Sequence, residues 1–312
     1  MTARRRIAIA IGDPNGIGPE IAVKAALRYL AGPIEPVLVG DGFVIREYAR
    51  QFVSGAELSV APVAALETAA FSPGALSPRA GLATVAYVRE AVRLAGRGEV
   101  FAVIGCPHSE TAINRAGIRF SGYPQLIAEL TGTAEDRVFL MLVAAGLRIA
   151  HVTLHESVRA ALSRITPELV VHAGRAAVEA AKRLGVAAPK LGVFGINPHA
   201  GEDGLFGDED ERVTRPAVVH LRQLGIAADG PAGADLILSR RRHDVYLAMF
   251  HDQGHIPVKL LSPLRASALS IGAPVLFSSV GHGCAFDIAG KGIADPASVV
   301  EALALLGSAA TG

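Results

Sequence analysis

The chain has 312 residues, of which 51% are hydrophobic and 19% are charged. This length suggests two domains or one large α/β unit, and the low charge content argues against disorder. Thirty basic residues balance 29 acidic ones, so neither a strongly basic nucleic-acid-binding protein nor an acidic tail is expected. The 34 glycines exceed the usual share of about 7% without a regular period, so the fold needs many tight turns.

Two cysteines, Cys106 and Cys284, are too few for a disulfide framework. The apolar run at 7–11 is too short for a signal peptide, and no stretch reaches the ~18–20 apolar residues that span a membrane. We therefore expect a soluble cytoplasmic protein with neither a membrane nor a nucleic-acid partner.

Short apolar runs alternate along the chain with longer amphipathic segments. The runs predict buried strands at 7–11, 36–39, 100–104, 138–143, 148–153, 191–196, 245–250 and 275–279. The amphipathic patterns predict helices at 19–30, 81–95, 167–184 and 296–306. This alternation indicates an α/β layer fold with a largely parallel sheet.

Polar residues and glycines interrupt this apolar background after predicted strands. They gather at 12–20, 106–125, 151–159, 197–207, 251–259 and 281–296. Ligands of open α/β sheets bind outside the carboxyl ends of the strands, so we expect the six segments to form one site.

Common nucleotide-binding and hydrolase motifs are absent. Ile21 stands where a dinucleotide-binding GxGxxG would have its third glycine, and residues 283–291 lack the spacing of a Walker loop. Arg159 replaces the second histidine of an HExxH zinc site, and no GxSxG is present. A Walker-type NTPase, a zincin protease and an α/β hydrolase are therefore not expected.

Three histidines follow predicted strands: His155, His199 and His251. Neutral imidazoles from three strand ends can converge on one divalent metal and leave positions open for substrate oxygen. The alternative is that each is an ordinary polar loop residue, and the residues alone leave both interpretations open. His255 could share a helix face with His251, although Pro257 argues against a long helix there.

Carboxylates and a lysine accompany these histidines. Asp235 and Asp252 are candidates for supporting the metal ligands or for acid–base chemistry. Lys259 is the preferred cation for a substrate carboxylate or phosphate, ahead of Arg265. Structural or solvent roles are expected for His108, His151, His172, His220 and His243.

Four long strings are specific enough to point to a family. They are GDPNGIGPE at 12–20, NPHAGE at 197–202, FHDQG at 250–254 and HGCAFDIAGKG at 282–292. Together they resemble the 4-hydroxythreonine-4-phosphate dehydrogenase family, whose fold is shared with the isocitrate and isopropylmalate dehydrogenases. The resemblance implies two α/β/α-layered domains with a cleft between them. The cofactor-side domain would span approximately 1–135 plus 264–312, and the metal and dimerisation domain 136–263.

The resemblance also implies a homodimer, a metal and a nicotinamide cofactor. The family's three metal-binding histidines match His155, His199 and His251, and imidazole ligands favour Zn²⁺ or Co²⁺ over Mg²⁺ or Mn²⁺. The family's cofactor loop matches 282–290, and Asp287 suits a ribose 2′-hydroxyl better than a 2′-phosphate, which favours NAD over NADP. The resemblance assigns the cofactor to His282, Gly283, Ala285, Asp287, Ile288 and Asp295.

The chain departs from the phosphate-substrate members of the family at the residues that hold the phosphate. Tyr123-Pro124 replaces His-Thr, and Ala268, Phe277 and Glu110 replace an asparagine, an arginine and a lysine. Apolar side chains make a poor cradle for a dianion. A flatter carboxylated substrate fits better, because Tyr123 and Phe277 can pack against a ring while Lys259 meets a carboxylate.

The segments at 121–124, 151–159, 268–272 and 278–283 resemble one branch of the family, the terephthalate-type cis-dihydrodiol dehydrogenases. This implies a metal-dependent, NAD-linked oxidative decarboxylation of an aromatic-acid cis-dihydrodiol to a catechol such as protocatechuate. Asp235 or Asp252 would assist proton removal. A phosphorylated hydroxy acid such as 4-hydroxythreonine 4-phosphate is the alternative substrate, and a non-catalytic metal- or ligand-binding homologue is the alternative of another class.

Overall fold

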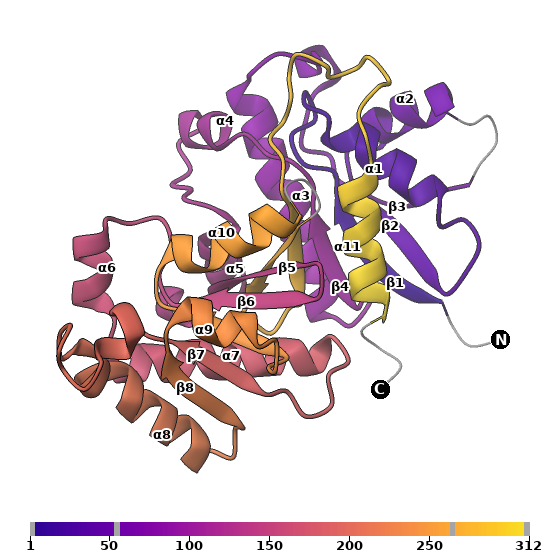
Figure 1. Cartoon of the computed structure of the whole chain (residues 1–312). Helices are drawn as coiled ribbons and strands as arrows, with labels where there is room; N and C mark the ends of the chain where they lie inside the picture. Colours follow the sequence, from indigo (N-terminus) through magenta and orange to yellow (C-terminus); the bar gives the residue numbers. More distant parts are fainter. Residues whose placement is uncertain (1–3, 53–56, 263–265, 309–312) are drawn as a thin grey trace. The chain divides into compact units, whose positions relative to one another are not determined.

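The computed structural model describes residues 4–52, 57–262 and 266–308, and the chain divides into two compact units. Unit 1 comprises Met1–Gly132 and Pro274–Ser308, and unit 2 comprises Thr133–Ala273. Both units combine strands with surrounding helices, so the protein has a mixed α/β fold (Figure 1). Among the described helices, none combines the length and the apolar character needed to cross a membrane.

Unit 1 contains parallel strands in the order β3-β2-β1-β4-β11. Their bounds are β1 Arg5–Ala10, β2 Ile34–Gly40, β3 Ser59–Pro62, β4 Ala102–Gly105 and β11 Phe277–Val280. Residues 7–10 and 102–105 are completely or almost completely buried aliphatics and glycine, which is typical of parallel strands covered on both faces. The carboxyl ends of β1, β4 and β11 therefore lie at one edge.

The helices of unit 1 form two contacting groups around these strands. One group contains α1 Gly18–Leu27, α2 Gly42–Phe52 and α11 Ala297–Ser308, and the other α3 Pro78–Gly96, α4 Glu110–Arg115 and α5 Tyr123–Thr131. Pro78 occupies the first turn of α3, where its missing N–H costs no hydrogen bond. Ser109 caps α4 by accepting the N–H of Ala112.

Unit 2 contains strands in the order β10-β5-β6-β9-β7-β8. Their bounds are β5 Phe139–Ala144, β6 Leu147–His151, β7 Leu191–Phe194, β8 Ala228–Ala232, β9 Val245–Ala248 and β10 Ser267–Ile271. β6, β9, β7 and β8 pair in parallel, whereas β10, β5 and β6 pair antiparallel. Seven of the nine strand pairings within the two units, among the described residues, are parallel, as expected, and the exception is the β10-β5-β6 side of unit 2. The reason is a tight hairpin at Ala145 and Gly146, whose φ angles of 49° and 76° join adjacent antiparallel strands.

The helices of unit 2 are α6 Val158–Arg164, α7 Pro167–Arg183, α8 Arg215–Gln223, α9 Ala234–Ser239 and α10 His251–Leu261. The helix α10 runs for 11 residues through Pro257, although this proline argued against a long helix there. Proline removes one backbone hydrogen bond, and the packing of α10 on β5, β6 and β9 stabilises the helix around it.

All eight predicted strands and all four predicted helices are confirmed, with ends displaced by a few residues. The sequence patterns missed β3, β8 and β10 and most of the short helices. β3 and β8 are mostly half-buried or exposed, so they lack the apolar run that identified the other strands.

Candidate functional site

Polar segments follow the carboxyl ends of neighbouring strands in each unit. The segments at 12–20, 106–125 and 281–296 follow β1, β4 and β11 in unit 1. Those at 151–159, 197–207 and 251–259 follow β6, β7 and β9 in unit 2. Because these strands are parallel neighbours, three segments meet at one edge in each unit. That all six form one site stays a prediction.

Two side chains of α1 hold the end of the loop that follows β11. Glu20 is completely buried and accepts the N–H groups of Gly292 at 3.2 Å and Ala294 at 2.8 Å. One turn later, Lys24 donates to the carbonyls of the same two residues, both at 2.8 Å, and to Glu20 at 2.7 Å. The loop is therefore fixed by charge-assisted bonds before α11 begins. The sequence signal for this contact is the four-residue spacing of Glu20 and Lys24, which places the two side chains on successive turns of one helix.

Asn15, in the segment that follows β1, holds a second loop at 72–75, and that loop packs against the loop after β11. The Asn15 side chain accepts the N–H of Ser72 at 2.9 Å and donates to the carbonyl of Ala75 at 3.1 Å. A Cβ atom at Gly74 would lie 3.0 Å from the Phe286 carbonyl, so the two loops are in close contact. The segment 12–20 thus contacts both the loop at 72–75 and the loop after β11.

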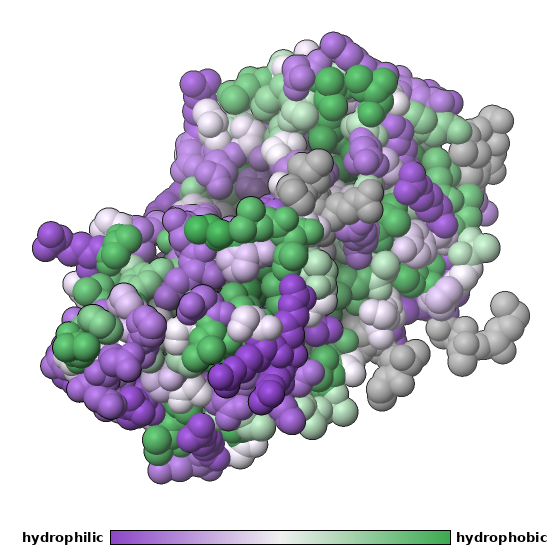
Figure 2. Space-filling model, in the orientation of Figure 1, coloured by the Kyte–Doolittle hydropathy of each residue, from purple (hydrophilic) through white to green (hydrophobic). Residues whose placement is uncertain are grey.

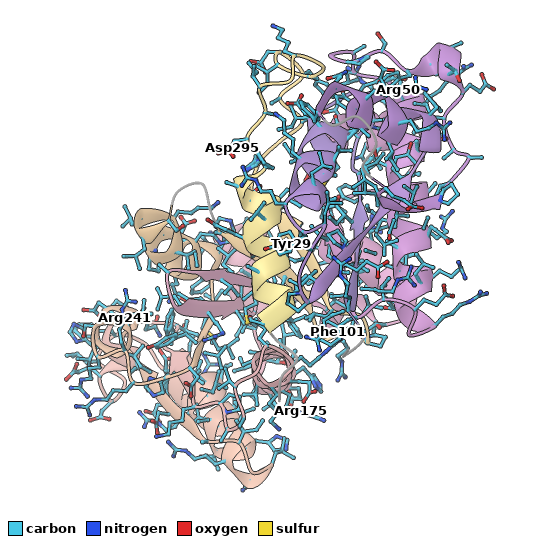
Figure 3. The ribbon with its side chains drawn as sticks, turned by 90° about the vertical axis from the view of Figure 1, so that its right-hand side faces the viewer. Tyr29, Arg50, Phe101, Arg175, Arg241 and Asp295 are labelled. Atoms are coloured by element: carbon cyan, nitrogen blue, oxygen red, sulfur yellow. The ribbon has the colours of Figure 1, made fainter. Side chains whose placement is uncertain are left out.

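The residues predicted to bind NAD lie on the loop after β11. Gly283, Asp287 and Asp295 are exposed, and His282, Ala285 and Ile288 are half-buried. Ala285 has a φ of 43° and its carbonyl accepts the N–H of Ile288 at 3.0 Å, so the backbone turns sharply here. Asp295 accepts the N–H of Ala297 at the start of α11 (Figure 3). The loop presents backbone and the Asp287 side chain to solvent, and its contact with a cofactor stays a prediction.

An aromatic cluster follows β4 in unit 1. The ring of Tyr123 lies 4.8 Å from that of Phe277 and 4.4 Å from that of His108, and its hydroxyl donates to the carbonyl of Cys106 at 2.9 Å. A Cβ atom at Gly105 would lie within 3.0 Å of both the Tyr123 and Phe277 rings, so the cluster is tightly packed. Two positions at which this chain departs from the phosphate-binding pattern, far apart in sequence, are therefore in contact.

Neutral groups dominate this cluster. Burial lowers the pKa of His108 to about 4, so its imidazole is uncharged near pH 7. Burial also raises the pKa of the Tyr123 hydroxyl, which stays protonated. Tyr123 is 4% exposed and Phe277 is 0% exposed. Both rings are thus buried below the surface at the carboxyl end of β4. Their direct contact with a substrate ring stays a prediction.

Asp13, at the same edge, has a buried carboxylate oxygen that makes no hydrogen bond among the described residues. It is completely buried after β1, its Oδ1 accepts the N–H of Asn15 at 2.9 Å, and its Oδ2 has no hydrogen-bond partner. Burial raises the pKa of this carboxyl to about 6. Burial likewise raises the pKa of the Cys106 and Cys284 thiols, so neither cysteine is a thiolate at neutral pH.

In unit 2, four histidine rings gather at the start of α10. The ring of His251 lies 3.6 Å from that of His255, 5.5 Å from that of His155 and 6.4 Å from that of His151. The Nδ1 atom of His251 lies 2.7 Å from a carboxylate oxygen of Asp252. A carboxylate accepts, so Nδ1 carries the proton and Nε2 keeps the lone pair that a metal needs.

The two inner histidines of this group are neutral. His151 donates from Nδ1 to the carbonyl of Leu140 at 3.2 Å, and its Nε2 lies 3.1 Å from Nδ1 of His255. Burial lowers the pKa of His151 to about 3 and that of His255 to about 4, and neighbouring imidazoles add to both shifts. These contacts are consistent with the structural role expected for His151, which is buried next to His255 and His251.

His199 and Asp235 are neighbours in the part of unit 2 that follows β7 and β8. His199 lies in the tight turn Pro198–Gly201 with a φ of 54° and an exposed ring. A Cβ atom at Gly233 would lie 2.9 Å from the Asp235 carboxylate and 3.9 Å from the His199 backbone. Lys259 lies on α10, two turns after His251. Arg265 lies outside the described residues.

Throughout the described residues, no three His, Cys, Asp or Glu side chains are arranged to hold a metal ion. The donor chemistry fits a divalent metal, because His155 and His251 are close together and Asp252 leaves Nε2 of His251 available. The convergence of His199 with these two ligands stays a prediction.

Comparisons with known proteins agree with the sequence resemblance. The chain is 54% identical, over 97% of its length and 98% of the relative, to a 1,2-dihydroxy-3,5-cyclohexadiene-1,4-dicarboxylate dehydrogenase from Comamonas sp.. Among solved structures, it is similar to a terephthalate 1,2-cis-dihydrodiol dehydrogenase from Burkholderia xenovorans LB400, with 51% identity, a TM-score of 0.79 and 98% of each chain covered. A 4-hydroxythreonine-4-phosphate dehydrogenase from Klebsiella pneumoniae shares 31% identity with a TM-score of 0.88 over 100% of both chains.

Residues 31–306 match the family described as "Pyridoxal phosphate biosynthetic protein PdxA". This match covers most of the chain, and the relatives extend it to nearly the whole length. The predicted resemblance to the family and to its dihydrodiol branch is thereby confirmed. The chain belongs to the PdxA family.

Proposed function

We propose that this protein oxidises an aromatic-acid cis-dihydrodiol of the terephthalate type with NAD, and that the oxidised product loses CO₂ to give a catechol such as protocatechuate. The named activities of its relatives support a dehydrogenase that acts on a CH–OH group. The contact between Tyr123 and Phe277 carries the choice of substrate, because two buried rings stand where a phosphate site needs polar or cationic groups.

The reaction balances as an oxidation followed by a carbon–carbon bond cleavage. The secondary alcohol carbon loses a hydride and its hydroxyl loses a proton, which gives a ketone β to a carboxylate. The bond to that carboxylate then breaks, CO₂ leaves, and the electron pair forms the carbon–carbon double bond of an enolate, which completes the aromatic ring; protonation of its oxygen gives the catechol directly. When bound, NAD accepts the hydride and a divalent metal polarises the substrate oxygens.

Unit 2 would hold the metal through His155, His199 and His251. Asp252 positions His251, because its carboxylate is already engaged with Nδ1 at 2.7 Å. Asp235 is exposed and adjacent to the His199 backbone, which makes it the better candidate to take the hydroxyl proton.

Lys259 supplies the cation for the substrate carboxylate in this proposal. It lies two turns after His251 on the same helix, and its charge contributes, after burial, to the lowered pKa of His255. His151 and His255 are neutral, so they add no positive charge beside the site. In this proposal the cations that attract the substrate carboxylate are therefore Lys259 and the metal.

A phosphorylated hydroxy acid such as 4-hydroxythreonine 4-phosphate is the second candidate substrate. The family description and the TM-score of 0.88 with the Klebsiella enzyme favour it at the level of the fold. The apolar Tyr123–Phe277 contact argues against it at the level of the site.

The test is the product stoichiometry with the dihydrodiol of terephthalate, NAD and Zn²⁺ or Co²⁺. We expect NADH, CO₂ and protocatechuate in equal amounts. NADH without CO₂ would refute the decarboxylation, and tight NAD binding without any turnover would indicate the non-catalytic homologue.

We extend the proposal to a homodimer on the basis of exposed apolar side chains on α10. Ile256, Leu260 and Leu261 are 55%, 78% and 48% exposed, and green surface lies over α10 in Figure 2. Apolar surface of this kind is commonly covered by a partner. Sedimentation equilibrium should show a dimer, and Leu260→Lys should shift it toward the monomer. A wild-type chain that remains monomeric at micromolar concentration would contradict this.

A further inference from the structure

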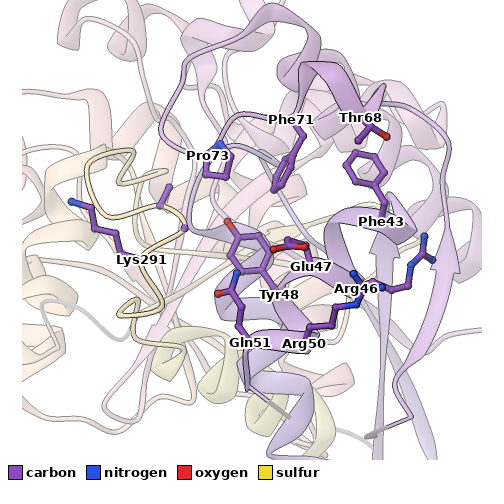
Figure 4. A pocket seen from close by; sticks show the side chains of 12 residues that line it. Phe43, Arg46, Glu47, Tyr48, Arg50, Gln51, Thr68, Phe71, Pro73 and Lys291 are labelled. Atoms are coloured by element: carbon purple, nitrogen blue, oxygen red, sulfur yellow. The ribbon is translucent and has the colours of Figure 1, made fainter. Parts of the chain in front are cut away.

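A pocket of about 580 Å³ lies in unit 1 between α2, the segment 68–73 and residues 289–291 (Figure 4). Its volume is within the range of small-molecule sites. None of the six residues predicted to bind NAD is among the described residues that line it. The pocket borders the proposed cofactor loop through Ala289 and Gly290, whereas the rest of its lining apart from Lys291 comes from α2 and the segment 68–73.

Two aromatic rings form one wall of the pocket. Phe43 of α2 and Phe71 meet edge to face with ring centroids 5.7 Å apart, and both are half-buried (Figure 4). Because the two rings are nearly perpendicular, they form an apolar corner in which a planar ring can pack against the face of one and the edge of the other.

Cationic side chains stand around the same pocket. Arg46 and Arg50 come from successive turns of α2, and Lys291 lies on the opposite rim. In the described part of the chain, no hydrogen bond or ion pair engages these three side chains, and Glu47 is the one carboxylate in the lining. An anion entering the pocket would meet unpaired guanidinium groups, which bind carboxylates through two parallel hydrogen bonds.

A buried hydroxyl without a partner lines the pocket as well. Tyr48 is 1% exposed, and its hydroxyl makes no hydrogen bond. Burial raises the pKa of Tyr48 to about 12, with the charges of Glu20 and Glu47 adding to the shift, so the group is a proton donor at neutral pH. In Figure 4 the hydroxyl points toward the Pro73 side of the pocket. Buried polar groups are usually satisfied, so an acceptor is missing at this point.

We propose that this pocket is a second ligand site, which binds a planar aromatic carboxylate. The ring would pack on Phe43 and Phe71, the carboxylate would pair with Arg46 and Arg50, and Tyr48 would donate to a ligand oxygen. The binding itself does not depend on the proposed reaction.

One consequence does rest on the proposed function. Ala289, Gly290 and Lys291 belong to the loop proposed to hold NAD, so occupancy of the pocket should change NAD affinity, and NAD should change ligand affinity by the same factor. The affinity of the enzyme for NAD would then depend on the concentration of aromatic acids.

Calorimetric titration of the intact protein with benzoate and with terephthalate tests the proposal. We expect saturable binding that persists at saturating NAD. Tyr48→Phe should weaken it about three- to tenfold, since one hydrogen-bond donor is lost, and Arg50→Gln by about tenfold or more. The matched controls are Tyr246→Phe, which removes another buried unpartnered hydroxyl in unit 2, and Arg175→Gln on the surface of α7. Both should leave the affinity unchanged.

Several results would overturn the proposal. They are no binding of either acid at millimolar concentration, displacement of the acids by NAD, or preferential binding of AMP. Affinity that His251→Ala abolishes while Tyr48→Phe and Arg50→Gln leave it intact would assign the acids to the catalytic residues instead. Because turnover is not the readout, a failure here is distinguishable from a failure of the proposed reaction.

Discussion

The loop after β11 in unit 1 and the histidines of unit 2 are built in opposite ways. Glu20 and Lys24, which pair with each other on one helix, fix the loop with four hydrogen bonds. The predicted metal ligands instead come from the segment after β6, a tight turn and the first residue of α10, and the side chain of His199 is 71% exposed. The protein alone thus forms the unit 1 edge, whereas in our account the unit 2 ligands are completed by a metal, which supplies binding energy for their final arrangement.

Removing a predicted metal ligand of unit 2 should have a larger effect on activity than any other substitution considered. His251→Ala should abolish stoichiometric metal binding and lower kcat by about 10³-fold or more, because transition-state charge loses several kcal/mol of stabilisation. Metal analysis of the purified protein and steady-state turnover measure both effects. His220→Ala, on the exposed surface of α8, is the control and should change neither. Intact metal content and turnover in His251→Ala would eliminate the metal-site assignment.

Substitutions at the unit 1 edge that Glu20 and Lys24 form should change the free energy of unfolding. Glu20→Ala leaves Lys24 without its buried partner and two backbone N–H groups unsatisfied, so the free energy of unfolding should fall by about 3 kcal/mol. Urea denaturation measures this loss. Glu67→Ala removes an ion pair in which the Glu67 side chain is 81% exposed, and should cost less than about 1 kcal/mol. Equal losses in the two variants would show that Glu20 does not hold the loop.

Asp13 gives the unit 1 edge a pH dependence. Its pKa of about 6 in the folded protein lies above its ordinary value of 3.8, so its contribution to stability is complete below pH 4 and is lost as the pH rises through 6. Asp13→Asn should therefore gain about 2–3 kcal/mol relative to wild type between pH 4 and pH 7. Urea denaturation across this range provides the measurement. A difference between the two proteins that is independent of pH would contradict the burial argument.

The smallest effect tests the packing of the aromatic cluster. Gly105→Ala places a Cβ atom 2.7 Å from the Phe277 ring and 2.9 Å from the Tyr123 ring, so it should destabilise the protein by about 1–2 kcal/mol. Gly96→Ala meets no atom within 4 Å and lies at the end of α3, so it should be neutral or slightly stabilising. A neutral Gly105→Ala would mean that the cluster can relax, and that Tyr123 and Phe277 do not define a rigid site.

The contrast between the two regions also explains what the sequence could predict. Long apolar runs identified the buried strands, and the strings at 12–20 and 282–292 identified the family. The antiparallel side of unit 2 was missed because Ala145 and Gly146 carry none of the usual Asn-Gly signal of a tight hairpin.

The contacts among His151, His251 and His255 depend on tertiary register. The pairing of His151 with Ala248 across β6 and β9 brings them together, and no local pattern contains that information. The helix through Pro257 is a similar case, because its packing on the strands outweighs the local preference.

We propose that the Tyr123–Phe277 contact favours an aromatic-acid substrate over a phosphate ester. The most direct test compares kcat/KM for the terephthalate cis-dihydrodiol with kcat/KM for 4-hydroxythreonine 4-phosphate, with NAD and the same metal in both assays. We predict a preference for the dihydrodiol of at least about 10³-fold, since a dianion finds no compensating charge at this cluster. Equal values, or a preference for the phosphate ester, would contradict the account.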